Sequence, residues 1–161
     1  MPDADISIRV AVAADAEVIA RSNAAMAEET EQRRLDQSTL LAGVRGLLQD
    51  PGKGVYYLAE HGGRVVGQLM LTYEWSDWRN GMFWWIQSVY VAPDLRRKGV
   101  YRALHRHVEA AARRTPGVCG IRLYVESENA VAQNAYHQLG MVRTGYLMFE
   151  TDWSAARPSD G

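Results

Sequence analysis

Three cations and a glycine stand together in the middle of the chain, in the stretch VAPDLRRKGVYRALHRH at positions 91–107. Arg96, Arg97 and Lys98 precede Gly99, and the residues after Gly99 have helical spacing. The first N–H groups of a helix have no partner within it, so they can bind an anion at its N-terminus. Gly99 would let the anion approach the backbone, because it has no side chain. The spacing alone leaves two interpretations open, a phosphate site and a solvated helix entry.

The stretch fits neither of the two common nucleotide-binding signatures. A Walker loop requires G-x-x-x-x-G-K-[ST], and the dinucleotide fold requires G-x-G-x-x-G. The residues around Gly99 satisfy neither pattern. ATP and NAD therefore lose support as ligands of this loop.

Strands and helices on both sides must position the loop, and the spacing of apolar residues indicates where they lie. Apolar alternation and short continuous apolar runs predict strands, whereas apolar residues recurring every three to four positions predict helices. The expected strands are 6–10, 54–60, 64–74, 82–91, 118–125 and 141–150, and the expected helices are 16–29, 36–48, 100–111 and 129–139.

This order of elements predicts an α/β fold with one mixed sheet of about six to seven strands flanked by helices. The strand–helix–strand crossover from 82–91 to 118–125 makes these two strands parallel neighbours. The chain has 161 residues and no internal repeat or low-complexity linker. We therefore expect a single domain over 1–153, followed by a mobile polar tail at 154–161.

Composition excludes several classes of protein. A single cysteine rules out an internal disulfide framework, and no clustered Cys and His residues suggest a metal site. No run of about 18 uncharged apolar residues is present, so we expect no membrane insertion and a cytoplasmic protein. The net charge of -1 argues against a general nucleic-acid binder.

Two motifs resemble those of the GNAT acetyltransferase superfamily. Residues 96–101, RRKGVY, resemble its acyl-CoA signature R/Q-x-x-G-x-G/A, with Tyr101 in place of the usual final Gly or Ala. Residues 126–141, ESENAVAQNAYHQLGM, are similar to its N-x-x-A-x-x-x-Y-x-x-x-G-F/M segment. Both motifs stand in the order that the family requires, and the resemblance spans residues 6–150.

The resemblance implies that acetyl-CoA is the co-substrate and that no metal takes part. The two parallel strands would splay apart at their C-terminal ends and hold the pantetheine arm, which would pair with the backbone of Val89, Tyr90 and Val91. Asn129 would bind the arm near its middle, although it has a second interpretation as a helix N-cap. The residues expected to hold the pyrophosphate are Arg96, Arg97, Lys98, Gly99, Val100, Tyr101 and Arg102.

The chemistry would be acetyl transfer to an amine, which must lose a proton first because a lysine-like amine has a pKa of about 10.4. A backbone N–H of the central strand, that of Val89, would polarise the thioester carbonyl. Tyr136 resembles the family's leaving-group acid, since a phenol of pKa about 10 can donate to a thiolate whose thiol has a pKa of about 8.5. The alternative for Tyr136 is a core tyrosine on an apolar helix face.

The general base departs from the family pattern, because Gln87 and Tyr124 stand where relatives place a glutamate. We expect Glu74 to act through a water chain, since it precedes the turn expected to face the acceptor. The other carboxylates considered are Glu28, Glu29, Asp77 and Glu126. The aromatic residues expected to form a slot for an amine with an apolar body are Tyr73, Trp75, Trp78, Trp84 and Trp85.

The sequence thus predicts an acetyl-CoA-dependent N-acetyltransferase that acts on a primary amine of a small molecule or peptide by direct transfer in a ternary complex. The alternative is a non-catalytic acyl-CoA sensor or interaction domain, which Gln87 motivates. A third interpretation, acetylation of aminoacyl-tRNA, needs a broader basic face than the chain offers. Family habit favours a homodimer, and the sequence does not identify the acceptor.

Overall fold

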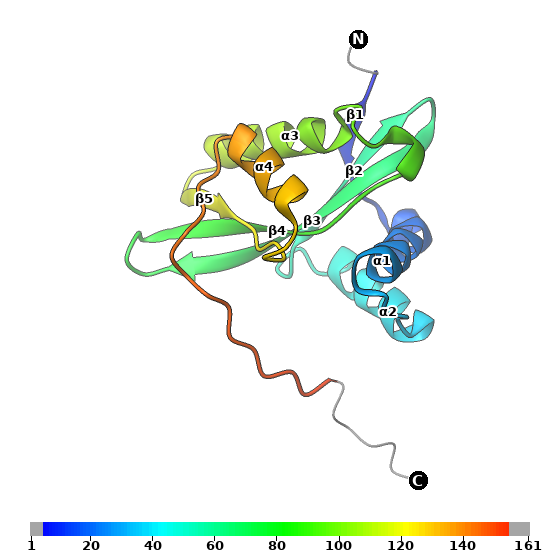
Figure 1. Cartoon of the computed structure of the whole chain (residues 1–161), viewed down its shortest axis with the longest axis horizontal. Coiled ribbons are helices and arrows are strands. Elements are labelled where there is room, and N and C mark those ends of the chain that lie inside the picture. Colours follow the sequence, from blue (N-terminus) through cyan, green and yellow to red (C-terminus); the bar gives the residue numbers. More distant parts are fainter. Residues whose placement is uncertain (1–4, 155–161) are drawn as a thin grey trace. The chain divides into compact units, whose positions relative to one another are not determined.

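The computed structural model describes residues 5–154, which belong to two compact units, Met1–Tyr124 and Val125–Gly161. The first unit holds one five-stranded sheet with its helices, and the second holds one helix (Figure 1). The elements of the first unit are β1 (Ser7–Val10), α1 (Ala16–Glu31), α2 (Gln37–Leu48), β2 (Val55–His61), β3 (Arg64–Ser76), β4 (Gly81–Val91), α3 (Val100–Arg114) and β5 (Val118–Arg122). The second unit contains α4 (Ala130–Gln138).

The sheet runs in sequence order, β1-β2-β3-β4-β5. Neighbours are antiparallel from β1 to β4, and β5 lies parallel to β4 because α3 carries the chain back across the sheet. Tight turns connect the long strands: Gly62 and Gly63 have φ values of 57° and 76° between β2 and β3, and Asn80 has φ 46° before β4. The mixed α/β layer fold predicted from the sequence is confirmed.

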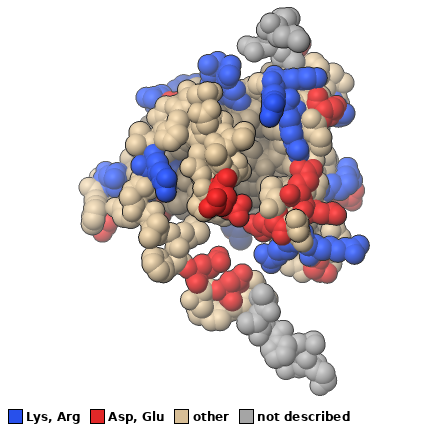
Figure 2. Space-filling model, viewed as in Figure 1, with Lys and Arg blue, Asp and Glu red and all other residues tan. Residues whose placement is uncertain are grey.

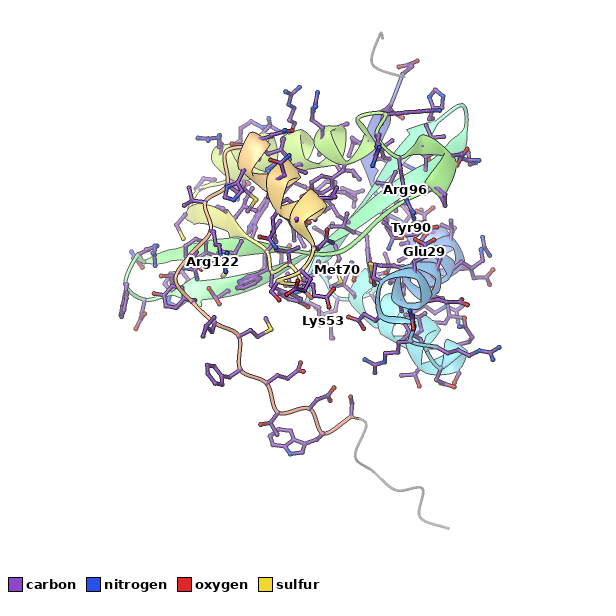
Figure 3. All side chains as sticks on the ribbon, in the orientation of Figure 1. Glu29, Lys53, Met70, Tyr90, Arg96 and Arg122 are labelled. Atoms are coloured by element: carbon purple, nitrogen blue, oxygen red, sulfur yellow. The ribbon has the colours of Figure 1, made fainter. Side chains whose placement is uncertain are left out.

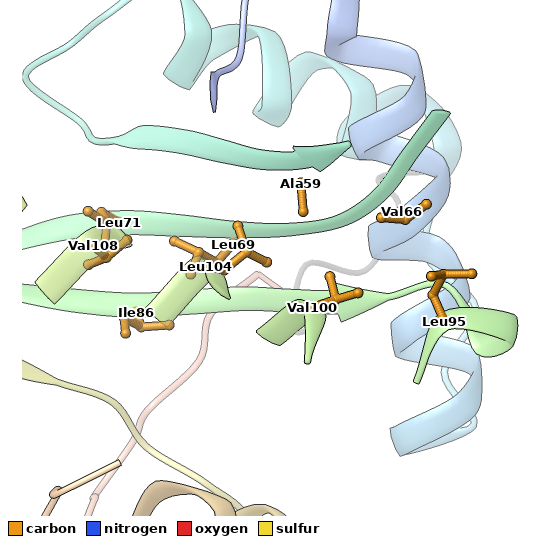
Figure 4. Close-up of a cluster of buried hydrophobic side chains, with 9 residues drawn as sticks. All are labelled: Ala59, Val66, Leu69, Leu71, Ile86, Leu95, Val100, Leu104 and Val108. Atoms are coloured by element: carbon orange, nitrogen blue, oxygen red, sulfur yellow. The ribbon is translucent and has the colours of Figure 1, made fainter. Parts of the chain in front are cut away.

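Each face of the sheet carries its own apolar layer. Leu69, Leu71 and Ile86 of the strands pack against Leu104 and Val108 of α3, and all five are at most 3% exposed (Figure 4). The opposite face carries α1 and α2, whose buried residues form a second cluster with β2. The members of that second cluster are Ala16, Ile19, Ala20, Val44, Leu47, Tyr56 and Leu58. Alternation along the strands thus places two helices on one face and α3 on the other.

The predicted strand at 141–150 is wrong, and the described sheet has five strands rather than six to seven. Residues 141–150 contain β-prone apolar side chains, but a strand forms only where a neighbour takes up its hydrogen bonds. The side chains of Val142, Leu147 and Phe149 are 84%, 81% and 91% exposed. An apolar pattern therefore overstated the strand content at the end of the chain.

The two parallel strands also differ from the prediction. β5 ends at Arg122 instead of position 125, and its pairing with β4 stops at Trp85 and Arg122. The strands are thus paired for only part of the length of β4, and the predicted pair of splayed parallel strands is not matched exactly. Most of the predicted mobile tail, residues 155–161, lies outside the described residues. The prediction of a single domain over 1–153 stays a prediction.

No helix within residues 5–154 is long and apolar enough to span a bilayer.

Gly67 of β3 allows α3 to begin close to the sheet. A Cβ placed on Gly67 would lie 2.7 Å from Cγ1 of Val100 and 3.3 Å from the carbonyl oxygen of Tyr90. A valine side chain is stiff, so it cannot move away without moving the helix. The N-terminus of α3 therefore approaches the end of β4 because position 67 carries no side chain.

We predict that Gly67→Ala lowers the free energy of unfolding by about 1–3 kcal/mol, because overpacking displaces α3. The matched control is Gly46→Ala in α2, where a Cβ meets nothing within 4 Å. That change should raise the free energy of unfolding by about 0.5–1 kcal/mol, since alanine is the better helix former. Denaturant titrations measure both, and equal midpoints for Gly67→Ala and the wild type would refute the close approach.

Candidate active site

The candidate site begins at an irregularity in β4. The register between β3 and β4 shifts so that Ser88 and Val89 together lie opposite Leu69. Ser88 has φ 50°, a left-handed conformation that residues other than glycine seldom adopt. The arrangement is a β-bulge, which bends a strand and re-aims the groups beside it. Strained backbone of this kind is concentrated at functional sites.

Beyond Trp85, β4 has a strand on one side only. Its pairing with β5 ends at Trp85 and Arg122, whereas β4 continues to Val91. On the other side β3 remains paired through Gly67 and Val91. Within residues 5–124, the stretch that contains the predicted Val89, Tyr90 and Val91 therefore has a free edge, on the side where β5 pairs with the earlier part of β4. An extended ligand with amide groups can pair with such an edge as a strand would.

The basic loop follows directly, after a 3-10 turn at Pro93–Leu95. Arg97 and Gly99 both have positive φ values, 62° and 84°. Gly99 is the N-cap of α3, and no side chain caps the helix. N–H groups at such a helix end can bind an anion. The side chains of Arg97, Lys98 and Arg102 are exposed around this helix end.

The next two residues of the predicted loop can contribute their backbone rather than their side chains. Val100 is 1% exposed and packs in the core beneath α3. The Tyr101 hydroxyl lies 3.2 Å from Nδ1 of His105, one turn further along the helix. The large side chain at position 101 is thus accommodated along α3.

Arg96 joins the loop to the end of β4 and to α1. Its Nε donates to the Val91 carbonyl at 3.0 Å, and its guanidinium lies 5.6 Å from the centre of the Tyr90 ring. Its outer nitrogen forms an ion pair with Glu29 at 2.6 Å, and Figure 3 shows these side chains grouped near α1. The structure therefore brings together the predicted residues of β4 and Arg96, and it gives Arg96 a structural partner in Glu29.

Gln87 and Tyr124 lie on or beside strands, and neither supplies a carboxylate. Gln87 Nε2 donates to the Thr72 hydroxyl at 2.7 Å. The Tyr124 ring lies 6.2 Å from that of Trp85, measured between ring centres. Gln87 is thus engaged in a hydrogen bond, and Tyr124 in an aromatic contact.

Glu74 is placed far from the bulge along the sheet. It pairs with Phe83, and Val89 stands six positions further along β4. At about 3.3 Å per residue, this separates them by roughly 20 Å. The Glu74 carboxylate forms an ion pair with Arg122, whose guanidinium lies 3.7 Å from the centre of the Phe83 ring. The structure therefore offers Glu74 no short path to a thioester held at Val89.

The predicted aromatic slot is divided by the pleat of the sheet. Tyr73 and Trp84 pair across β3 and β4 with ring centres 6.4 Å apart. Trp85 follows Trp84 directly, so it points to the opposite face. Trp75 and Trp78 are 58% and 84% exposed. These five residues do not form a single slot.

The two remaining predicted residues lie in the second unit. Asn129 is the N-cap of α4, and its Oδ1 accepts from the Ala132 N–H at 3.1 Å. Tyr136 is half-buried, and burial raises the pKa of its phenol. Gly140, with φ 86°, follows the end of α4 in the left-handed conformation that often terminates a helix. A phenol with a raised pKa stays protonated at neutral pH, as a proton donor must.

Sequence reasoning missed a buried polar contact beneath the bulge. Gln68 is 1% exposed, and its Nε2 donates to Asn23 Oδ1 at 2.9 Å and to the Ser88 carbonyl at 3.2 Å. The available signal was an amide within the apolar run RVVGQLML, since a buried polar side chain needs a partner.

Within residues 5–154, no group of three or more His, Cys, Asp or Glu side chains could hold a metal ion.

Comparisons with known proteins show the family to which the chain is similar. The family model described as "Acetyltransferase (GNAT) family" matches residues 18–141. A possible acetyltransferase from Clostridium difficile 630 is 44% identical with a TM-score of 0.85, over 91% of this chain and 97% of that one. A comparison with curated protein sequences gave no significant match.

Two more distant structures share the fold. A ribosomal-protein-alanine N-acetyltransferase from Brucella melitensis biovar Abortus 2308 is 18% identical with a TM-score of 0.74, over 92% of this chain and 99% of that one. An aminoglycoside N-acetyltransferase in complex with CoA is 16% identical with a TM-score of 0.74, over 92% and 95%.

We predict that Gly99→Ala lowers the affinity for CoA about tenfold, because an alanine with φ near 84° is strained by roughly 1–2 kcal/mol and would turn the loop. Gly117→Ala is the matched control, since Gly117 has φ 83° in the turn before β5. Isothermal titration calorimetry with CoA compares the two variants. Equal affinities would show that the N-terminus of α3 does not hold the diphosphate.

Proposed function

Because the chain belongs to the GNAT acetyltransferase family, we propose that it transfers the acetyl group of acetyl-CoA to a primary amine of a small molecule or peptide. The transfer is direct, within a ternary complex, and takes place in the cytoplasm. One observation carries the proposal: the open edge of β4 leads directly to the uncapped N-terminus of α3. These are the two surfaces that the arm and the diphosphate of CoA require.

The fit of the CoA diphosphate is supported by the helix end. Gly99 removes the side chain that would block the backbone, and Arg97, Lys98 and Arg102 provide exposed positive charge nearby. Each exposed cation contributes only about 1 kcal/mol, so the oriented N–H groups must fix the position of the diphosphate. The amides of the pantetheine arm can pair with Val89, Tyr90 and Val91. No metal is needed for either contact.

The reaction forms a C–N bond to the amine and breaks the C–S bond of the thioester. Negative charge develops on the carbonyl oxygen, and the Val89 N–H at the bulge is the donor proposed to stabilise it. The departing thiolate takes a proton from the Tyr136 phenol or a hydrogen bond from it. The amine loses its own proton to solvent.

The proposal does not rely on a carboxylate base. Glu74 is paired with Arg122, and Glu29 is paired with Arg96. A lysine-like amine is neutral in only about one molecule in 2500 at pH 7. We therefore propose that the enzyme binds this neutral fraction. Glu74 acting through a water chain remains the alternative.

The acceptor is an amine of unassigned identity. Acetylation of aminoacyl-tRNA lacks support, because Lys and Arg are interspersed with Asp and Glu on the face shown in Figure 2, and the net charge is -1. A homodimer stays a prediction.

The second candidate function is a non-catalytic acyl-CoA sensor. It is favoured by Gln87, because an amide at this position cannot act as the general base that a carboxylate would provide.

We predict that Tyr136→Phe lowers kcat about 100-fold with little change in the KM for acetyl-CoA, because a general acid contributes roughly that much. The matched control is Tyr146→Phe, since Tyr146 belongs to the same unit and is 74% exposed. Thiol release from acetyl-CoA with a panel of amines measures both. A wild type that binds acetyl-CoA but turns over with no amine would favour the sensor.

We predict that the pH profile of kcat/KM follows the acceptor amine. Burial raises the pKa of Tyr136, so its phenol stays protonated over the pH range in which a peptide α-amine titrates. The inflection should move upward by about two to three pH units from a peptide α-amine, of pKa about 7.7, to a lysine-like amine, of pKa about 10.4. An inflection at one pH for both acceptors would instead indicate a base on the enzyme.

A further inference from the structure

Gln68 connects three elements beneath the bulge. It lies in the middle of β3, and its Nε2 reaches Asn23 on α1 and the Ser88 carbonyl on β4. Asn23 is 6% exposed and also hydrogen-bonds the buried side chain of Tyr56 on β2. A polar chain thus crosses the apolar layer from β2 to β4 at the bulge in β4.

This arrangement costs stability, so it needs a reason other than packing. The Oε1 of Gln68 is buried and has no hydrogen-bond partner among the described residues. An unsatisfied buried acceptor is unfavourable, and so is the positive φ of Ser88. An apolar side chain of similar size would avoid the first cost. The amide at position 68 is therefore explained by the two hydrogen bonds that its Nε2 donates, to Asn23 and to the Ser88 carbonyl.

The Nε2 of Gln68 fixes a peptide plane. The Ser88 carbonyl can only accept, so it selects the nitrogen end of the amide, and Asn23 Oδ1 holds the same end. No cis peptide occurs among the described residues, and in a trans peptide the carbonyl and the following N–H point in opposite directions. With the Ser88 carbonyl turned toward the Gln68 side chain, the Val89 N–H of the same peptide points away from that side chain. The side of β4 that β5 leaves unpaired beyond Trp85 is the side that this N–H can serve.

We propose that Gln68 is a positioning residue, which holds the Ser88 carbonyl and thereby aims the Val89 N–H at the thioester carbonyl. This inference rests on the proposed function and adds the side chain that sets its backbone donor. Gln68 itself does not touch the substrate. It acts through the peptide between Ser88 and Val89, and Asn23 holds the Gln68 amide in the required orientation.

The first test compares kinetics. Gln68→Met keeps the length of the side chain but removes the donor, and we expect kcat to fall about 10- to 100-fold with the KM for acetyl-CoA changed less than threefold. Asn23→Ala leaves the Gln68 amide free to rotate and should show a smaller fall in kcat. Val44→Ala is the control, because it removes a buried contact in the same helical layer without touching the bulge. It should lower the melting temperature and leave kcat unchanged.

The second test monitors the peptide between Ser88 and Val89 by NMR and does not depend on turnover. In ¹H–¹⁵N spectra of the intact chain, the Val89 amide should shift in Gln68→Met and in Asn23→Ala, and should not shift in Val44→Ala. An unmoved Val89 amide, or a kcat equal to that of the wild type in both variants of the polar chain, overturns the inference. If the wild type turns over with no amine while the Val89 amide moves as expected, the proposed function fails and the role of Gln68 in orienting the peptide stands.

Discussion

β4 has a partner on both sides for only part of its length, and the other features of the candidate site depend on this. Up to Trp85 it is held between β3 and β5; beyond Trp85, β3 is its only partner strand among residues 5–154. The backbone on the free side would be unpaired, and unpaired backbone groups are costly unless water or a ligand takes them. The bulge at Ser88 lies in this half of the strand, so the irregular backbone and the open edge coincide.

The surrounding fold brings the N-terminus of α3, which no side chain caps, to the same place. α3 begins close to the sheet because Gly67 has no side chain, and Gly99 turns the chain into the helix without a side-chain cap. Arg96 ties the loop to the Val91 carbonyl and to Glu29. The site is therefore built mainly from backbone, with side chains that hold the backbone in position. Such a site supports transfer chemistry without a conspicuous set of catalytic side chains.

The sequence predicted the order of elements as far as α4, the loop before α3 and the N-cap at Asn129, because these features depend on local chemistry. It failed for residues 141–150, since a β-prone pattern does not show whether a partner strand is present. Glu74 was predicted as the base because it precedes a turn, but its distance from Val89 depends on the register between β3 and β4. The contact of Gln68 with Asn23 joins residues 45 positions apart, which no local pattern reveals.

The central claim is that a bulged strand edge and the N-terminus of α3 together hold the acetyl donor. A crystal structure with a non-hydrolysable acetyl-CoA analogue tests it most directly. The account predicts the diphosphate on the N–H groups that follow Gly99, and the analogue's carbonyl oxygen about 2.9 Å from the nitrogen of Val89. A carbonyl oxygen bound elsewhere, with the Val89 N–H turned toward β3, would contradict it.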